Sequence, residues 1–546
     1  MRRHILIAVL LILLFAQVAS AMDAVIAYRS DTNQSYCTAA TAENCPKIRF
    51  WNSSASSGNG SWGPEIELST SDNPVNFAVI KASPVSQKLV LVTLSDDDNL
   101  DGYVCMSNCS STASWQRTTN IGNVATSAVR SFDVEFETST GDAILVYAID
   151  STNTSRDLAY KILPSANTNF SSSSEQYIND AGGEIDYTWV RLDRKPMTSQ
   201  ELLLVAFDAS SATEDINAWV WDGSAWGNQT EISNDASDTS GGEALAVRYS
   251  ADGTKGMVIG ANGSDGNVAY RYWNGAAWSA VGTFDVDTGG TADDVAWLNL
   301  KADPMSDDLQ AIAVDDEADL TAIYWNGTTW NVTSNIDTGL DTETERPADF
   351  DWLPSGSTGR LVWDTDTTGT NLSQRICSPI CNGSTSTISS YAGSGNWLTL
   401  FRNPTASDSV KILGLRLYSI PGNDPILSFR FNGTDYANYG NAGISTDVGD
   451  DARESYSLAF LLIGGDMPPN IVLSSPPPGY ITNETTMNFS FTATDDNSTT
   501  MNCSLWIDNS MIAYDPTVGN GSLFNFSVLL SENIHFWNIK IGRAHV

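Results

Sequence analysis

Trp221-Asp-Gly-Ser-Ala-Trp226 is the first of three nearly identical hairpin sequences in this chain. The other two are Trp273-Asn-Gly-Ala-Ala-Trp278 and Trp325-Asn-Gly-Thr-Thr-Trp330, each 52 residues after the one before. An Asp-Gly or Asn-Gly pair between two short apolar stretches is a strong signal for a β-hairpin turn. Alignment on the first Trp gives eight equivalent positions, 52 to 58 residues apart: Trp51, Cys105, Leu163, Trp221, Trp273, Trp325, Cys377 and Phe431. The chain therefore carries eight copies of one repeated unit.

One unit, from Val295 to Val332, shows the strand pattern of the repeat. Its apolar or alternating stretches are residues 295–300, 309–314, 320–325 and 329–332, with turn residues between them. Four short antiparallel strands at this period are typical of propeller blades. The sequence thus predicts an all-β fold, an eight-bladed β-propeller over about residues 22–464, with seven blades as the alternative.

The first unit lacks an inner strand. Residues 24–28, 47–51 and 64–68 give three strands, whereas Ser455 to Leu462 is a lone strand after the last complete unit. We expect the lone strand to complete the first blade and so to close the ring. Closure would hide two sheet edges that could otherwise pair with other chains.

The first 21 residues have the pattern of an export signal peptide. Met1-Arg-Arg-His4 is a basic start, residues 5–15 are apolar, and Ala19-Ser-Ala21 is a small-residue cleavage site. Eleven apolar residues are too few to span a bilayer, so a retained anchor is the weaker interpretation. Because no later stretch is long and apolar enough to cross a membrane, we expect a secreted or cell-surface protein without a direct membrane span in the given chain.

A second, smaller unit follows a Pro- and Gly-rich linker at residues 465–480. Alternating stretches at 487–494, 502–508 and 523–528 predict an immunoglobulin-like (Ig-like) β-sandwich over residues 468–540. The last six residues, 541–546, match one translation of a common sequencing-library adapter. We expect that they are read-through and that the sandwich is incomplete; the alternative is a native tail.

Three motifs of this unit carry a resemblance. They are Pro469-Asn-Ile471, Phe491-Thr-Ala-Thr-Asp495 and Asn502-Cys-Ser-Leu505, and through them the segment resembles the Ig-like or cadherin-like modules of archaeal and bacterial surface proteins. With the repeats before it, the chain resembles a β-propeller cell-surface protein of that type. The resemblance implies a partner on a late strand for Cys503, and this sequence has none there.

Charge and histidine content exclude several classes of function. The net charge of −37 excludes nucleic acid as a partner, because phosphate binding needs clustered Lys and Arg, and it disfavours anionic membranes. The three histidines are His4, His535 and His545, so the repeats contain none. Ser-His-Asp triads and histidine-based zinc sites therefore cannot lie in the repeats.

The cysteines are expected to form local disulfides, as suits an oxidising compartment. Cys105 with Cys109 and Cys377 with Cys381 occupy the hairpin position of the Trp pair, and Cys37 with Cys45 makes a third local pair. A cysteine metal site is the alternative, but the two hairpin pairs lie five units apart in the sequence. Nineteen Asn-x-Ser/Thr sequons, many at hairpin turns, make glycosylation feasible in an exported protein.

One acidic loop resembles the first half of a calcium loop. Asp97, Asn99 and Asp101, followed by Gly102, fit Asp-x-Asn-x-Asp-Gly, in which side chains two apart wrap one hard cation. The closing acid is absent, because Asn108 stands in its place. The alternative is that these residues cap a turn. No cofactor is required by the sequence, and Ca²⁺ is the one candidate.

Acidic residues near the starts of the predicted inner strands form the second candidate site. If the inner strands line the channel, these side chains can ring one mouth and bind a cation or sugar hydroxyls, or cleave a glycosidic bond. Aromatic neighbours, Trp189, Trp297, Trp352 and Trp397, can stack on a sugar or pack between blades. The acidic set is Asp133, Asp186, Glu243, Asp294 and Asp349.

The favoured function is non-enzymatic: a propeller that presents loops to a protein or glycan partner, on an Ig-like stalk. The alternatives are a glycan-active hydrolase or lyase using carboxylates at the channel mouth, and a structural component of the envelope. Ser250-Ala-Asp-Gly-Thr254 is the nearest match to the Asp-box of sialidase propellers and departs after its third residue. Missing histidines and enzyme motifs favour the binding protein over the enzyme.

Overall fold

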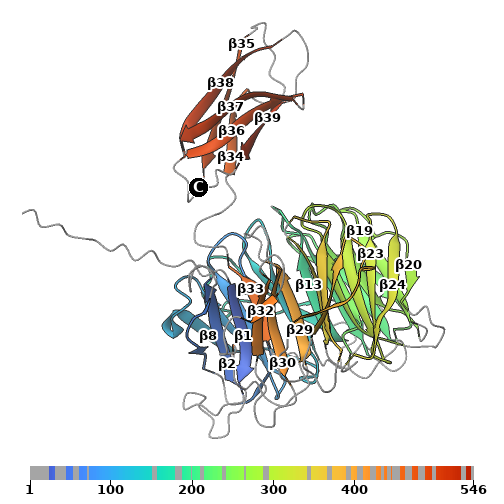
Figure 1. The fold of residues 1–546 in the computed structure, drawn as a ribbon. Coiled ribbons are helices and arrows are strands. Elements are labelled where there is room, and N and C mark those ends of the chain that lie inside the picture. Colours follow the sequence, from blue (N-terminus) through green and yellow to red (C-terminus); the bar gives the residue numbers. More distant parts are fainter. Residues whose placement is uncertain are drawn as a thin grey trace, which may run out of the picture.

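The computed structural model describes twenty-six stretches of the chain: residues 24–30, 45–52, 61–69, 73–149, 157–178, 187–197, 199–209, 214–236, 242–263, 266–286, 294–340, 346–353, 355–365, 372–388, 395–402, 410–417, 426–431, 436–438, 444, 456–461, 470–476, 486–494, 500–508, 510–519, 521–530 and 537–542. Within them the fold is all-β, with one short 3-10 turn at Thr112–Ser114 (Figure 1).

Seven four-stranded antiparallel sheets follow one another along the chain, and in each the strands pair in sequence order. The first three are β5–β8 (Val75–Ala82, Leu89–Ser95, Asn99–Cys105, Trp115–Asn123), β9–β12 (Phe132–Phe136, Ala143–Ala148, Leu158–Leu163, Gln176–Ile178) and β13–β16 (Tyr187–Arg194, Leu202–Asp208, Asp215–Trp221, Trp226–Ser233). The others are β17–β20 (Leu245–Tyr249, Gly256–Ala261, Asn267–Trp273, Gly282–Asp285), β21–β24 (Val295–Ala302, Leu309–Asp315, Asp319–Trp325, Trp330–Thr338), β25–β28 (Ala348–Trp352, Gly359–Asp364, Leu372–Cys377, Ser386–Ile388) and β29–β32 (Gly395–Arg402, Val410–Leu417, Ile426–Phe431, Tyr436–Asn438).

One further sheet joins the two ends of this region. β33 (Tyr456–Phe460) pairs antiparallel with β1 (Ala24–Ser30), which continues through β2 (Cys45–Asn52) to β3 (Ser61–Trp62) and β4 (Ile66–Glu67). The blue strand β1 and the orange-red strand β33 lie side by side in Figure 1 although they are far apart in the sequence. The segment at 455–462 thus pairs where the sequence predicted it would.

The core lies between neighbouring sheets. Every residue of the second strands β6, β10, β14, β18, β22 and β26 is buried. These strands read as continuous apolar runs because a neighbouring sheet covers each face. For example, Val92 of β6 and Tyr147 of β10 share one cluster of buried side chains. Stacked four-stranded sheets of this kind are the architecture of a β-propeller, so the predicted fold type is confirmed.

The Trp hairpins are part of this scaffold. Trp221 packs on Trp226, Trp273 on Trp278 and Trp325 on Trp330, with ring centroids 5.1–5.6 Å apart, and the first Trp of each pair is buried. Disulfides Cys105–Cys109 and Cys377–Cys381 stand at the equivalent hairpins, as predicted. Cys45 is also disulfide-bonded, and its predicted partner Cys37 lies outside the described residues.

The C-terminal unit consists of two three-stranded sheets, β34-β35-β38 and β37-β36-β39. Their strands are β34 Asn470–Ser475, β35 Thr486–Thr494, β36 Thr500–Ile507, β37 Ser510–Gly519, β38 Leu523–Leu529 and β39 Trp537–Gly542. Phe491, Leu505 and Phe526 belong to one buried cluster that both sheets share. Cys503 is buried in the same cluster and is bonded to no described cysteine.

Candidate functional site: charged residues on the inner strands

We call the first strand of each four-stranded sheet, together with β33, an inner strand. The inner strands are β5, β9, β13, β17, β21, β25, β29 and β33. Consecutive inner strands from β33 through β29 pack against one another. The series returns to its start at Tyr456 of β33, whose hydroxyl donates to the carbonyl of Trp397, 2.8 Å away in β29. They carry six cations, Lys81, Arg191, Arg194, Arg248, Lys301 and Arg402, and five carboxylates, Asp133, Glu135, Asp193, Asp349 and Asp351. This near balance contrasts with the net charge of −37 for the chain.

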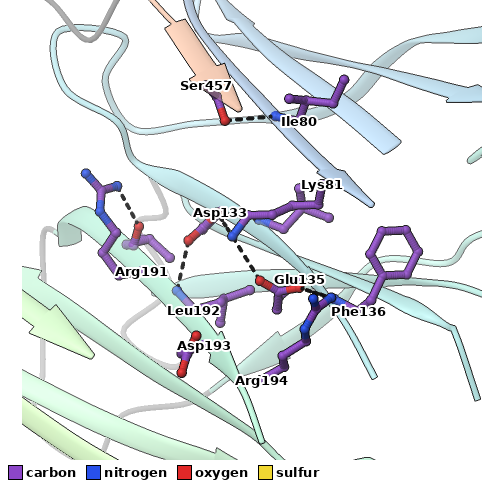
Figure 2. Close-up of polar contacts among 12 residues, drawn as sticks. Ile80, Lys81, Asp133, Glu135, Phe136, Arg191, Leu192, Asp193, Arg194 and Ser457 are labelled. Atoms are coloured by element: carbon purple, nitrogen blue, oxygen red, sulfur yellow. Dashed lines mark hydrogen bonds and ion pairs between the residues drawn. The ribbon is translucent and has the colours of Figure 1, made fainter. Parts of the chain in front are cut away.

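Four of the carboxylates accept a backbone N–H from the next inner strand. Asp133 accepts from Leu192 at 2.9 Å, as Figure 2 shows, and Asp193 accepts from Tyr249 at 2.7 Å. The same arrangement recurs between β25 and β29. There Asp349 accepts from Leu400 at 2.7 Å, and Asp351 from Arg402 at 2.6 Å. A buried N–H must find an acceptor, and these aspartates supply one where no β-ladder continues from sheet to sheet. They therefore tie adjacent sheets together.

Asp349 is the most enclosed of them. Its side chain has no exposed surface. Besides Leu400, the carboxylate accepts from its neighbour Phe350 N–H at 2.8 Å and from the Asn299 amide at 2.7 Å, and the Lys301 ammonium lies 3.4 Å away. A substrate would have to displace these donors to reach the carboxylate. Asp349 is therefore built as a link among three sheets.

Glu135 joins three sheets in the same way (Figure 2). Lys81 of β5 donates to it at 2.9 Å and Arg194 of β13 at 3.2 Å, and the Phe136 N–H donates at 2.9 Å. Arg194 also reaches past β9 to the carbonyl of Ala82 at the end of β5, 3.3 Å away. Lys81 in addition lies 4.0 Å from Asp133.

Glu243 lies just before β17 and holds two arginines. Arg191 of β13 donates to it through Nε, and Arg346, which precedes β25, donates at 3.2 Å. These arginines also lie over buried indole rings, Arg191 over Trp189 and Arg346 over Trp297. Trp397, also buried, lies under Arg346 as well, and Trp352 donates to the Lys301 carbonyl at 3.2 Å. The four tryptophans named from the sequence pack inside the scaffold.

Burial and pairing shift the pKa values of this set in opposite directions. Burial raises the pKa of Asp193 and of Asp349, although Arg248 and Lys301 respectively act against it. Burial also disfavours the charged form of Glu135, but Lys81 and Arg194 outweigh it and hold the pKa of Glu135 below its usual value. For Lys81 the carboxylates outweigh burial, and its pKa is raised. Partners within the set thus maintain the charged forms of Glu135 and Lys81, whereas burial prevails over the partners of Asp193 and Asp349.

A pH-dependent effect follows for Glu135→Gln. Because the folded-state pKa of Glu135 is depressed, its stabilising contribution is complete above the unfolded pKa of about 4.3 and is lost as the pH falls through the folded value. We expect the variant to melt below the wild type at pH 7 and the gap to shrink below about pH 4. Melting temperatures of both proteins between about pH 3 and pH 7, the range that spans carboxylate titration, check this. A gap that stays constant would contradict it.

The predicted acidic ring is only partly assembled. Asp133, Glu243 and Asp349 lie on or beside the inner strands, whereas Asp186 lies outside the described residues. Asp294 stands before β21, where its N–H donates to Asp316 at 2.9 Å in the loop between β22 and β23. Sequence reasoning missed the cations and Glu135, Asp193 and Asp351. The available signal was charge inside apolar strands, as in Asp133-Val-Glu135 and Asp349-Phe-Asp351.

In the candidate calcium loop, the carboxylates of Asp97 and Asp101 accept hydrogen bonds from other groups of the protein. Asp97 accepts from Ser95 at 2.5 Å and from the Asn99 amide at 2.7 Å, and these hydrogen bonds outweigh burial and lower its pKa. Asp101 accepts from Arg117 at 2.7 Å and from the Asn120 N–H at 3.0 Å. No group of three or more His, Cys, Asp or Glu suited to a metal ion occurs within the described stretches. Calcium at this loop stays a prediction.

Comparison with known proteins finds likeness of structure alone. No family model and no curated protein matches the chain. A periplasmic gluconolactonase from Pseudomonas aeruginosa is 12% identical, covers 81% of this chain and 99% of its own, and has a TM-score of 0.41. The SapL1 lectin in complex with alpha methyl fucoside is 11% identical, with coverages of 69% and 98% and a TM-score of 0.34. Dihydro-heme d1 dehydrogenase NirN is 7% identical, with coverages of 78% and 74% and a TM-score of 0.46. The fold assignment rests on the sheets of this chain.

Proposed function

We propose that this protein is an exported, non-enzymatic binding protein of the cell surface, whose propeller loops engage a protein or glycan. The proposal extends to an eight-bladed ring over about residues 22–464, closed by β33, and to an Ig-like or cadherin-like stalk over residues 468–540. Eight sheets in chain order and the pairing of β33 with β1 support the ring. Two facing sheets with a shared core support the sandwich.

The burial and hydrogen bonding of the inner-strand carboxylates favour a binding function over a catalytic one. A glycosidase needs two carboxyl groups that both reach the substrate, one with a raised pKa. Asp193 and Asp349 have raised pKa values, but each is buried and each accepts a backbone N–H from the next sheet. Raised pKa values arise in structural ion-pair networks as well as in active sites. The network geometry explains them here.

Export is supported by the signal-like first 21 residues and by disulfides that need an oxidising compartment. Glycosylation is supported by the position of the sequons. Asn108, Asn228, Asn326 and Asn382 are exposed and lie on hairpins between third and fourth strands or at the start of a fourth strand. Within the described residues, no helix is long and apolar enough to cross a membrane.

A combined binding and turnover screen of the secreted protein tests the proposed function. Glycan arrays and surface-protein extracts detect binding, and oligosaccharide pools analysed before and after incubation detect turnover. The proposal expects binding without turnover. Turnover that Asp294→Asn abolishes would establish the hydrolase or lyase alternative, since Asp294 is not among the carboxylates that link sheets. Neither binding nor turnover would favour a structural component of the envelope.

Calcium removal gives a separate prediction for the loop of Asp97, Asn99 and Asp101. If the loop binds Ca²⁺, chelation is expected to lower the melting temperature, because a ligand that binds the folded state stabilises it by mass action. Melting curves with calcium and with a chelator check this, and Asp97→Asn is expected to remove the difference. Identical curves would end the calcium proposal.

A further inference from the structure

We propose that the ends at which the inner strands finish form an oxyanion site, for a carboxylate, sulfate or phosphate group. Five cations from five different sheets occupy the last or next-to-last positions of their strands. They are Lys81 of β5, Arg194 of β13, Arg248 of β17, Lys301 of β21 and Arg402 of β29.

The strand ends meet at this level, as direct contacts show. Arg194 bonds the carbonyl of Ala82 in the second sheet before its own. Arg402 bonds the carbonyl of Ala302, again two sheets away, at 3.4 Å. Lys301 reaches in the opposite sense to the carbonyl of Leu400 at 3.1 Å. These contacts place Arg194, Lys301 and Arg402 within reach of strand ends two sheets away, so the finishing ends of alternate inner strands lie at one level.

The cations face the solvent and their carboxylate partners do not. The five cationic side chains are 18–42% exposed, whereas their partners Glu135, Asp193, Asp349 and Asp351 are at most 10% exposed. Asp193, Asp349 and Asp351 accept backbone N–H groups of the next sheet. Glu135 accepts the N–H of Phe136 in its own strand. Solvent at these strand ends therefore meets positive groups, although the chain carries a net charge of −37.

Arg248 is the residue on which an anion would dock. Its side chain is the most exposed of the five at 42%, and Nη1 donates to Asp193 at 3.1 Å. Asp193 first, and more weakly Asp351 and Glu135, favour its charged form, so Arg248 stands among groups from several sheets. A guanidinium has five donors in a fixed fork that matches an oxyanion, and one bond to Asp193 leaves donors for a ligand.

Charge and surroundings limit the ligand to a small oxyanion or a single anionic group of a larger molecule. With Asp133, 4.0 Å from Lys81, five carboxylates lie beside the five cations, so the strand ends carry no formal excess of positive charge and attract an anion only through the exposed cations. A polyanion such as nucleic acid would be repelled by the acidic remainder of the surface. This inference is independent of the proposed protein or glycan binding, because a free anion tests it.

Calorimetric titration of the intact secreted protein with sodium sulfate, sodium phosphate, a uronate oligosaccharide and a matched neutral oligosaccharide is the test. We expect saturable binding of the anionic probes that weakens with added NaCl, and none of the neutral one at this site. Tighter binding of the uronate oligomer than of sulfate would identify a glycan as the source of the anionic group. Arg248→Gln is expected to weaken anion binding about tenfold or more.

Arg117→Gln is the matched control. Arg117 lies on the outer strand β8 and pairs with Asp101 of β7 at 2.7 Å, much as Arg248 pairs with Asp193. It is expected to leave anion binding unchanged. If Arg248→Gln does not fold, Lys81→Gln and Arg402→Gln replace it. No saturable binding of sulfate, phosphate or uronate at millimolar concentration, or equal weakening by Arg117→Gln, would overturn the proposal.

Discussion

Replacing Asp349 by alanine is expected to lower the free energy of unfolding by about 3–5 kcal/mol. The carboxylate is fully buried and accepts from Leu400 N–H, Phe350 N–H and Asn299. Its removal leaves buried donors without an acceptor and leaves the Lys301 ammonium without its 3.4 Å partner. Urea denaturation followed by tryptophan fluorescence measures the loss.

Two further variants separate the role of Asp349 from a general effect of removing a charge. Asp349→Asn keeps one side-chain oxygen and is expected to lose less than Asp349→Ala. Glu317→Ala removes an exposed carboxylate and is expected to change stability by at most about 0.5 kcal/mol. A loss below about 1 kcal/mol for Asp349→Ala would show that the carboxylate does not hold the sheets together.

Tyr456→Ala is expected to lower the free energy of unfolding by a similar amount, about 3–5 kcal/mol. Tyr456 is buried in β33, where it packs in a cluster with Ile26 of β1 and Trp397 of β29. Its hydroxyl bonds the Trp397 carbonyl at 2.8 Å and the Thr399 hydroxyl at 3.1 Å. Truncation therefore opens a cavity and breaks polar contacts where the first and last sheets meet.

The graded control is Tyr456→Phe, which removes only the hydroxyl and is expected to lose about 1 kcal/mol. Tyr514→Ala removes an exposed ring from the C-terminal unit, and the unfolding transition of the propeller is expected to remain unchanged. If Tyr456→Ala unfolds at the wild-type urea concentration, the contact between β29 and β33 contributes nothing to stability, and the ring closure proposed above fails.

Local signals made the repeats predictable. The Asn-Gly and Asp-Gly turns fix hairpins within a few residues, so the Trp pairs and the two hairpin disulfides followed from spacing alone. The continuous apolar runs of strands such as Leu309–Asp315 marked buried second strands. The lone strand at 455–462 could be assigned because three strands at the N-terminus lacked a fourth.

The charged network was predicted only in part, because its bonds join residues far apart in the sequence. Asp133 meets Leu192, and Asp349 meets Leu400, across sheets whose relative register no local pattern specifies. The search for acidic residues near strand starts also selected Asp294, whose N–H instead donates to Asp316 in a loop. Charged residues inside otherwise apolar strands, such as Arg191 and Asp193, were the signal that was overlooked.

Hydrogen–deuterium exchange at the Leu400 amide tests most directly whether the inner-strand carboxylates act as links between sheets. In the wild type this amide is expected to exchange as slowly as amides within the β25–β26 ladder, because Asp349 accepts its proton. In Asp349→Ala, under conditions where the protein stays folded, Leu400 is expected to exchange much faster while the Arg402 amide, held by Asp351, stays protected. Exchange of Leu400 at the rate of an exposed loop in the wild type, or an unchanged rate in Asp349→Ala, would contradict the account.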